Sequence, residues 1–369
     1  MTIGALKEPA GERRVAILPE HFSLIKKLDC ELLVEQGAGE NSYSSDKDYT
    51  DAGAKISSRE EVIANADILV CINLPEEKEF PSLKDKVLVG TFHPVYHKEI
   101  FEKIASSGVS VFSLDMLPRS TRAQSMDVLS SQANIAGYKS IIVAAGIYPK
   151  YFPMLMTAAG SIAPAKVLIL GAGVAGLQAI ATARRLGGVV EVFDTRPAVK
   201  EEVQSLGARF VEVEGVADDS KAGGYAVEQT EDFKQRQKER IAVAVKKADI
   251  VVTTAQIFGK KAPILITKEM VESMKSGSVI IDIASSTGGN TELTKDNETV
   301  VYNGVTIVGN SNLPSTMPYD SSKLYGKNMI HFLELMWNKE RQFNLNFEDD
   351  LIKSSCITYK GSIYNERIK

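Results

Sequence analysis

Short apolar runs alternate with longer amphipathic segments through the first third of the chain. The apolar runs have the length of buried strands, and apolar positions in the segments between them recur at helical spacing. The expected strands cover residues 31–35, 66–72, 87–91 and 109–113, and the expected helices cover 20–27, 58–64 and 98–106. This alternation predicts a mostly parallel sheet covered by helices.

A second series of the same kind begins at Lys166. The expected strands are 167–170, 189–193, 208–213, 249–255, 278–284 and 305–309, and the expected helices are 174–186, 200–206 and 268–274. Two such series predict an α/β fold with two Rossmann-like domains, each built on a mostly parallel, doubly wound sheet, with a cleft between them.

The domain boundaries follow from the length and from the last third of the chain. A chain of 369 residues exceeds the usual size of one hydrophobic core. After Asn310 a proline-punctuated segment leads into a long amphipathic helix, whose apolar positions include Leu324, Met329, Phe332 and Met336. We expect this helix to return to the first domain. The prediction is a first domain of 1–129 plus 321–369 and a second domain of 130–320.

Composition narrows the class of protein without giving a function. The chain is 44% hydrophobic and 24% charged, which is typical of a soluble globular protein. A formal charge of -4 argues against non-specific nucleic-acid binding. The three cysteines lack CxxC spacing, so neither a disulfide framework nor a zinc site is indicated. The N-terminus lacks the apolar core of a secretory signal, and the apolar stretch 140–183 is too often interrupted for a membrane span, so a cytoplasmic protein is expected.

The segment 215–237 stands apart from these compact series. It is polar, contains Gly223 and Gly224 together, and interrupts a domain whose other connections are short. We expect a mobile surface loop that runs into a helix.

A glycine-rich sequence between the strand at 167–170 and the helix at 174–186 carries the strongest local signal. Gly171, Gly173 and Gly176 occupy GxGxxG positions. The first glycine permits a tight turn, the second lets the backbone approach a pyrophosphate, and the third allows close packing of helix on strand. Free N–H groups at the start of the helix attract phosphate charge. This pattern predicts a dinucleotide site.

An acidic residue at the end of the next strand indicates which dinucleotide is bound. Asp194 is placed to accept hydrogen bonds from the adenosine-ribose hydroxyls and would repel a 2′-phosphate. NAD(H) is therefore favoured over NADP(H), although Arg196 would accommodate a phosphate if it pointed inward. The alternative interpretation, a glycine-rich helix start with a surface aspartate, explains fewer of these features.

A second polar group follows the strand at 109–113. The sequence PRSTRAQSMDVLSSQANIAGY, residues 118–138, is expected near the junction of the two domains, where its side chains can hold an amide and a ribose. They are Arg119, Arg122, Gln124, Asp127 and Ser130. Spacing alone gives equal weight to a charged helix start in which Asp127 and the two arginines form solvated pairs.

The chain resembles the NAD(H)-binding component of proton-translocating nicotinamide nucleotide transhydrogenases, which are relatives of alanine dehydrogenase. The resemblance rests on the RxxRAQxMD loop together with KEPAGERRVAILP, GAGVAGLQAIATARRLGGVVEVFDTRP, AGGY and SVIIDIASSTGGN, and it covers nearly the whole chain. It implies an oxidoreductase and translocase, in which hydride passes directly between NAD(H) on this chain and NADP(H) on a partner subunit.

The resemblance also implies site residues and partners. Gln124, Arg119 and Asp127 are the expected catalytic residues, with Gln124 bringing the nicotinamide ring against the partner's NADP(H), and Tyr225 belongs to a loop that closes over the nucleotide. The expected NAD(H)-binding residues are Arg119, Gln124, Ser125, Asp127, Ser130, Gly171, Gly173, Val174, Gly176, Asp194, Arg196, Gly224, Tyr225 and Gln256. Membrane-spanning and NADP(H)-binding subunits, a homodimer, peripheral association with the inner membrane and no metal site are expected.

Two other functions stay open. In an alanine-dehydrogenase-like enzyme, Arg14 matches the arginine that binds the substrate carboxylate and His93 lies about where the catalytic histidine is kept. However, Asn73 stands at the place of the substrate-binding lysine and Ser286 at that of the catalytic aspartate, which weakens both substrate anchoring and acid-base chemistry. A non-catalytic NAD(H)-sensing module is the third possibility.

Overall fold

A computed structural model describes residues 1–213 and 230–368. The chain divides into two compact units: unit 1 comprises Met1–Gln132 and Ser315–Lys369, and unit 2 comprises Ala133–Pro314. The division falls within the helix α5 (Val128–Ile147). No helix among the described residues is long and apolar enough to cross a membrane.

Unit 1 contains an eight-stranded sheet with the order β17-β16-β6-β5-β4-β1-β2-β3. Its strands are β1 (Thr2–Ala5), β2 (Glu31–Glu35), β3 (Lys55–Ser57), β4 (Ile68–Val70), β5 (Val87–Gly90), β6 (Ser110–Ser113), β16 (Cys356–Tyr359) and β17 (Ser362–Ile363). The pairs from β1 to β6 are parallel, whereas β16 joins β6 in antiparallel fashion and β17 joins β16 likewise. The winding of the sheet reverses between β1 and β4, so the switch point of unit 1 lies at the carboxyl ends of these two strands.

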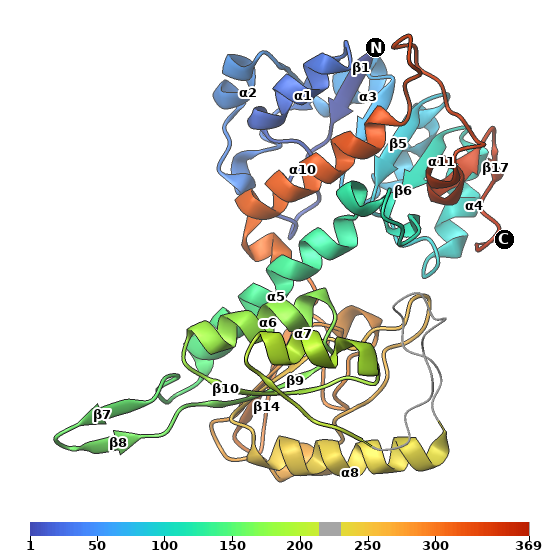
Figure 1. Cartoon of the computed structure of the whole chain (residues 1–369). Coiled ribbons are helices and arrows are strands. Elements are labelled where there is room, and N and C mark those ends of the chain that lie inside the picture. Colours follow the sequence, from blue (N-terminus) through green and yellow to red (C-terminus); the bar gives the residue numbers. More distant parts are fainter. Residues whose placement is uncertain (214–229, 369) are drawn as a thin grey trace. The chain divides into compact units, whose positions relative to one another are not determined.

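Six α-helices accompany this sheet in the described part of unit 1 (Figure 1). They are α1 (Phe22–Lys27), α2 (Asp46–Ala52), α3 (Arg59–Asn65), α4 (Lys98–Ser106), α10 (Pro318–Glu334) and α11 (Asp350–Ser355). Ser45 and Ser58 begin α2 and α3 with capping boxes, which satisfy N–H groups of the first turn. In α10, Met329 and Phe332 pack into the same core as strand residues of the sheet. The centroids of the Phe332 and Phe112 rings lie 5.9 Å apart.

Unit 2 contains a seven-stranded sheet with the order β11-β10-β9-β12-β13-β15-β14. Its strands are β9 (Lys166–Leu170), β10 (Val189–Phe193), β11 (Arg209–Phe210), β12 (Ile250–Thr253), β13 (Val279–Asp282), β14 (Glu298–Tyr302) and β15 (Val305–Gly309). Every neighbouring pair is parallel except β14–β15. The winding reverses between β9 and β12, so the carboxyl ends of these two strands form the switch point.

Helices cover both faces of the unit 2 sheet, as its strand pattern predicts. The helices are α6 (Val174–Arg185), α7 (Lys200–Ser205), α8 (Glu231–Lys247) and α9 (Lys268–Glu272), together with the second part of α5. Ile169 and Val252 pack in a core with residues of α5, α6 and α7. Leu168 and Val251, on the opposite face, pack with residues of α8 and α9. Buried side chains on both faces explain the uninterrupted apolar runs of these strands.

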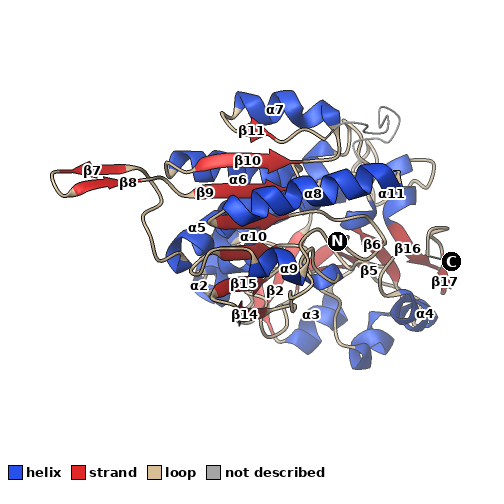
Figure 2. Cartoon of the chain, turned by 90° about the horizontal axis from the view of Figure 1, so that it is seen from below, coloured by secondary structure: helices blue, strands red, loops and turns tan. Residues whose placement is uncertain are grey.

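The fold class agrees with the prediction, but several segments differ from it. An antiparallel hairpin of β7 (Leu155–Thr157) and β8 (Gly160–Ile162) interrupts the apolar stretch before β9 and extends away from the unit 2 sheet (Figure 2). β14 and the short central strand β1 carried too little apolar pattern to be predicted. The loop predicted over 215–237 lies largely outside the described residues, and from Glu231 onward the chain is helical.

Candidate nucleotide-binding site

The turn that follows β9 needs glycine at two positions for reasons internal to the protein. Gly171 has a φ of +106°, and a Cβ there would lie 2.5 Å from Oγ1 of Thr254. A Cβ on Gly176, in the first turn of α6, would lie 1.9 Å from the carbonyl oxygen of Gly171. Both glycines therefore allow the helix to start directly against the end of the strand.

Gly173 is different, because nothing in the fold demands a glycine there. Its φ is −76°, which any residue adopts, and apart from its neighbours in the chain no atom of the described residues lies within 4 Å of the position that its Cβ would occupy. Gly173 is the N-cap of α6 and offers no side chain to bind the N–H groups of the first turn. The missing side chain thus leaves open space at a helix N-terminus, which is a favourable place for an anionic group. Val174, the first residue of the helix, is exposed beside it.

Asp194 lies at the end of β10, next to this turn. Its Oδ2 accepts a hydrogen bond of 2.6 Å from the backbone N–H of Ala172. Arg196 donates from Nε to Oδ1 at 2.9 Å and from Nη2 to Oδ2 at 2.8 Å, and the Asp194 side chain is only 6% exposed. The carboxylate is therefore oriented toward the glycine turn, and the guanidinium of Arg196 is directed at that carboxylate.

The loop after β12 completes the switch point of unit 2. Thr254 donates a hydrogen bond from N–H to the carbonyl oxygen of Leu170 at 2.9 Å, and its hydroxyl donates to the carbonyl oxygen of Gly171 at 3.2 Å. Gln256 follows with an exposed side chain. The β9 turn and the β12 loop are thus held together by direct contacts.

The polar loop of unit 1 presents side chains to the surface from an anchored backbone. Arg119, Gln124 and Ser125 are exposed. Ala123 and Met126 are buried, and Nδ2 of Asn328 in α10 donates a 2.7 Å hydrogen bond to the carbonyl oxygen of Ser125. Burial of Ala123 and Met126 and the bond from Asn328 therefore hold the 3₁₀ helix Gln124–Met126, although the side chain of Gln124 is exposed.

Asp127 and Arg122, which both belong to this loop, have different partners. The Asp127 carboxylate accepts hydrogen bonds from the backbone N–H of Ser130 at 2.9 Å and from its hydroxyl at 2.6 Å, at the start of α5. Arg122 forms ion pairs with Asp349 and Asp350. These contacts of Asp127 and Arg122 are not the pairs that the alternative interpretation assumes, and the ion pairs of Arg122 connect the loop to the start of α11.

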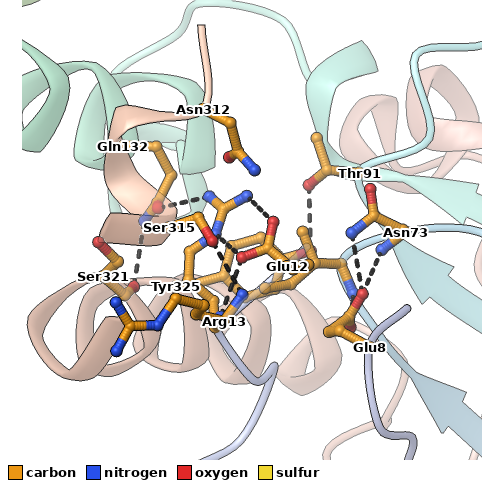
Figure 3. A network of polar contacts seen from close by, with 12 residues as sticks. Glu8, Glu12, Arg13, Asn73, Thr91, Gln132, Asn312, Ser315, Ser321 and Tyr325 are labelled. Atoms are coloured by element: carbon orange, nitrogen blue, oxygen red, sulfur yellow. Dashed lines mark hydrogen bonds and ion pairs between the residues drawn. The ribbon is translucent and has the colours of Figure 1, made fainter. Parts of the chain in front are cut away.

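A buried polar network lies in unit 1 near the amino end of the chain (Figure 3). Arg14 donates from Nε and Nη2 to the two carboxylate oxygens of Glu12 at 2.9 and 2.6 Å, and from Nη1 to Oε1 of Gln132 at 2.8 Å. Burial would raise the pKa of Glu12, but the hydrogen bonds and charge of Arg14 outweigh it and lower the pKa to about 2. The pair is held in a geometry typical of strong charge-assisted bonds.

A second carboxylate of this network lies at the unit 1 switch point. The Glu8 side chain accepts hydrogen bonds from the N–H groups of Ile72 and Asn73 at 2.6 and 3.0 Å, and from Nδ2 of Asn73 at 2.9 Å. Burial raises the pKa of Glu8 to about 7 even though these donors favour the charged form. Neither Glu8 nor Glu12 was predicted as a site residue. For Glu12, the available signal in the sequence was its position two residues before Arg14.

Tyr325 of α10 connects this network to the residues that directly follow β4 and β5. Its hydroxyl donates to the carbonyl oxygen of Cys71 at 3.1 Å and lies 3.0 Å from the hydroxyl of Thr91. The Tyr325 side chain is buried, so these contacts satisfy a hydroxyl that has no access to water. The helix that returns from the end of the chain is thereby joined to the strand ends of the unit 1 sheet.

Residues matched to alanine dehydrogenase are distributed between the two units. His93 has a φ of +50°, and its Nδ1 lies 3.6 Å from Oδ2 of the buried Asp115, whose other oxygen accepts a 2.5 Å bond from the hydroxyl of Ser113. Ser286 lies in unit 2 in the exposed part of a 3₁₀ helix. Gly224 and Tyr225 lie outside the described residues, and among the described ones no cluster of His, Cys, Asp and Glu is arranged to hold a metal ion.

Two family descriptions together match nearly all of the chain. Residues 4–136 match "Alanine dehydrogenase/PNT, N-terminal domain", and residues 140–366 match "Alanine dehydrogenase/PNT, C-terminal domain". The chain belongs to the alanine dehydrogenase/PNT family. The family assignment agrees with the resemblance that the sequence motifs indicated.

Within this family the chain is more similar to transhydrogenase subunits than to alanine dehydrogenases. It is 44% identical to a protein of Rickettsia prowazekii that is named as the first part of an NAD(P) transhydrogenase subunit alpha, over 100% of this chain and 97% of that protein. The protein of the same name from Rhodospirillum rubrum is 43% identical over 96% and 94% of the two chains. Alanine dehydrogenase of Staphylococcus haemolyticus is 27% identical, over 100% and 95%.

Solved structures show the same order of similarity. A transhydrogenase structure from Sinorhizobium meliloti has a TM-score of 0.90 and 40% identity, and the match covers 98% of this chain and 100% of that chain. An L-alanine dehydrogenase structure has a TM-score of 0.82 at 23% identity, covering 100% and 98%, and it shows the common fold.

Proposed function

We propose that this chain is the NAD(H)-binding component of a proton-translocating transhydrogenase, active with partner subunits. In this assignment hydride passes directly, with Re/Si specificity, between NAD(H) on this chain and NADP(H) on a partner polypeptide. Relatives named as transhydrogenase subunits alpha, at 42–44% identity over nearly the full chain, support it.

The observation that carries the proposal is the open N-terminus of α6 beside the Asp194 carboxylate. The open space at Gly173 fits a pyrophosphate bound by the N–H groups of the helix start. Asp194 is then placed for the adenosine ribose. Because Arg196 already donates two side-chain hydrogen bonds to Asp194, the pair offers no net positive charge for a 2′-phosphate, which favours NAD(H).

The nicotinamide end is assigned to the polar loop at residues 118–138, and Gln256 is a further NAD(H)-binding residue. Arg119, Gln124, Ser125, Asp127 and Ser130 would hold the carboxamide and its ribose. Bound NAD(H) supplies the transferable hydride, and the protein supplies position and exclusion of water. The buried anchors around Gln124 support a positioning role, because a side chain on a fixed backbone can orient a ring without having to move.

Partners complete the proposed activity. The NADP(H) site and the membrane-spanning part would come from other subunits, as suggested by relatives whose name designates one portion of one subunit. This chain would associate with the inner membrane through them and would itself form a homodimer, the commonest symmetry of soluble oligomers.

The deciding experiment measures hydride exchange between NADH and an oxidised NAD analogue. The purified chain is assayed alone, with an NADP(H)-binding transhydrogenase component, and with that component plus NADP(H). Transfer that requires both the component and NADP(H) is the expected result. Tight NADH binding without transfer under any condition would contradict the proposal and favour a nucleotide-sensing module.

Alanine-dehydrogenase-like chemistry is the second candidate, and the His93–Asp115 contact is the observation in its favour. The contacts of Arg14 and Asn73 speak against it, because Arg14 is bound to Glu12 and Gln132 and Asn73 is bound to Glu8. Oxidation of NADH by the isolated chain in the presence of pyruvate and ammonia would support this candidate; we expect none.

A further inference from the structure

The segment that follows β13 is not used by the nucleotide contacts described above. It contains the sequence STGGN, residues 286–290, and comes directly after the buried carboxylate of Asp282, the last residue of β13. Asn290 at its end is also buried. Polar side chains that are this deeply buried need specific partners, and those partners define what the segment does.

Asp282 shapes the segment through hydrogen bonds to its backbone. One carboxylate oxygen accepts from the N–H of Ala284 at 3.0 Å. The other accepts from the N–H of Asn290 at 2.7 Å and from the hydroxyl of Thr294 at 2.6 Å. Gly288 and Gly289 have positive φ values of 104° and 78°, so the chain turns sharply and returns to the carboxylate. Asn290 is fixed in place by this arrangement.

Asn290 in turn holds the loop that follows β12. Its Nδ2 donates to the carbonyl oxygens of Ala255 and Pro263 at 2.8 and 2.9 Å, and its Oδ1 accepts from the N–H of Ala255 at 3.0 Å. Two donors and one acceptor in one planar group are what a carboxamide provides; a carboxylate lacks the donors and an aliphatic chain lacks both. The side chain therefore acts as a brace between two backbone segments.

The contacts continue from this loop to the glycine turn. Thr254, next to Ala255, donates its hydroxyl to the carbonyl oxygen of Gly171. Gln256 follows Ala255 with its side chain exposed. A continuous set of hydrogen bonds thus runs from Asp282 through Asn290 and the β12 loop to the first glycine of the nucleotide turn.

We propose that Asn290 is a positioning residue for the nicotinamide half of bound NAD(H), acting through the backbone of residues 254–256. The inference rests on the proposed function. Asp194 assigns the adenosine half to the β10 side of β9, so the other half of the dinucleotide extends over the switch point toward β12. Asn290 braces the loop on that side through its hydrogen bonds to Ala255 and Pro263.

The test compares two ligands that share the adenosine half. Dissociation constants for NADH and AMP are measured by calorimetry on the full chain and on Asn290→Ala, with the fluorescence of bound NADH as a report on the surroundings of the reduced ring. We expect the variant to lose about tenfold in NADH affinity and to change by less than about twofold in AMP affinity, with shifted NADH fluorescence. Asn365→Ala is the control, because Asn365 is a buried amide of unit 1 that donates to the carbonyl oxygen of Ser354. It should lower stability and leave the NADH-to-AMP affinity ratio unchanged.

An unchanged ratio and unshifted fluorescence in folded Asn290→Ala would overturn the inference. If that variant does not fold, Thr254→Val is measured in its place, because it keeps Asn290 and removes the hydroxyl contact to Gly171. It should lower the NADH-to-AMP affinity ratio severalfold. An unchanged ratio in Thr254→Val would then overturn the inference. Failure of the wild-type chain to bind NADH at all would count against the proposed function, so the two failures are distinguishable.

Discussion

The two units share one strand order and differ in what occupies their switch points. The order β3-β2-β1-β4-β5-β6 in unit 1 corresponds to β11-β10-β9-β12-β13-β15 in unit 2. In unit 2, α6 starts within the glycine turn after β9, and its N-terminus has open space at Gly173. In unit 1, the segment after β1 brings in the Glu8 carboxylate, which accepts hydrogen bonds from the backbone N–H groups that follow β4.

This difference shows that topology provides the place for a ligand and that local residues decide whether a ligand or the protein itself fills it. The switch point of a doubly wound sheet gathers backbone N–H groups at the carboxyl ends of the strands. In unit 1 the protein supplies the carboxylate for those groups. In unit 2 the missing side chain at Gly173 leaves space at the helix start, where we propose that an anionic group of a ligand binds.

The largest expected effect comes from Gly176→Ala. A Cβ there would lie 1.9 Å from the carbonyl oxygen of Gly171, so α6 must move away from β9. We expect a loss of about 3 kcal/mol or more in the free energy of unfolding, measured by urea denaturation, because overpacking against backbone cannot relax through a side chain. A loss below about 1 kcal/mol would mean that the close approach of helix and strand is not a requirement of the unit 2 fold.

The pH dependence of stability tests whether the Glu8 carboxyl group occupies the unit 1 switch point. Its pKa is raised in the folded state from 4.5 to about 7, so the folded protein holds this proton more tightly than the unfolded chain. The resulting stability is present below pH 4.5 and is lost as the pH rises through about 7, a change of about 3 kcal/mol. Wild type should lose stability relative to Glu8→Gln over this range.

Glu12 does not interfere with that measurement. Its lowered pKa of about 2 makes a contribution that is present above pH 4.5 and is lost only as the pH falls toward 2. Urea denaturation of both proteins from about pH 4.5 to about pH 8 therefore isolates Glu8. Parallel stability profiles would show that Glu8 does not titrate as its burial indicates.

Gln124→Asn separates ring placement in the unit 1 loop from nucleotide affinity in unit 2. The shorter side chain withdraws the carboxamide by one methylene while the anchored backbone stays in place. Stopped-flow assays with the partner component should show hydride transfer slowed by about tenfold or more, and NADH affinity should change by less than about twofold. Equal losses in rate and affinity would argue against a positioning role.

Gly173→Ala is matched to Gly176→Ala, because both add one methyl group in the same turn. Apart from neighbours in the chain, no described residue lies within 4 Å of the added methyl at Gly173, so the free energy of unfolding should change by less than about 1 kcal/mol. The methyl would occupy the space assigned to the pyrophosphate, and NADH affinity should fall by about tenfold or more in calorimetry. Unaltered affinity would place the phosphates elsewhere.

The smallest effect is expected for Thr253→Val at the end of β12. Among the described residues, its buried hydroxyl has no hydrogen-bond partner, so its removal should change the free energy of unfolding by less than about 1 kcal/mol. Thr358→Val in unit 1 is the control, because that hydroxyl donates to the carbonyl oxygen of Val109 at 2.8 Å and accepts from the N–H of Val111 at 3.2 Å. The control should lose about 1–3 kcal/mol in the free energy of unfolding, measured by thermal or urea denaturation. Similar losses in both variants would indicate that the Thr253 hydroxyl has a hydrogen-bond partner.

Local patterns were sufficient for the elements of unit 2 that form the candidate site. The strands at 189–193 and 305–309 have the predicted bounds, since uninterrupted apolar runs mark strands that are buried on both faces. Strand β1 was missed, although it is central in unit 1, because Gly4 interrupts its short apolar run. Its Gly4, where a Cβ would lie 2.7 Å from Cβ of Ala66, looks like a turn residue until the packing of α3 is known.

The sequence by itself determined the glycine turn after β9 and its acidic neighbour, because these residues lie close together in the chain, and it determined the family through short motifs that recur along nearly the whole chain. Only the tertiary structure decided that Glu8 meets Asn73, that Arg14 is bound by Gln132, and that Asn290 braces Ala255. Such contacts join residues from different strands and loops, and their free energy depends on burial and on geometry that no local period encodes. The same reason explains why two sheets with one strand order have different contents at their switch points.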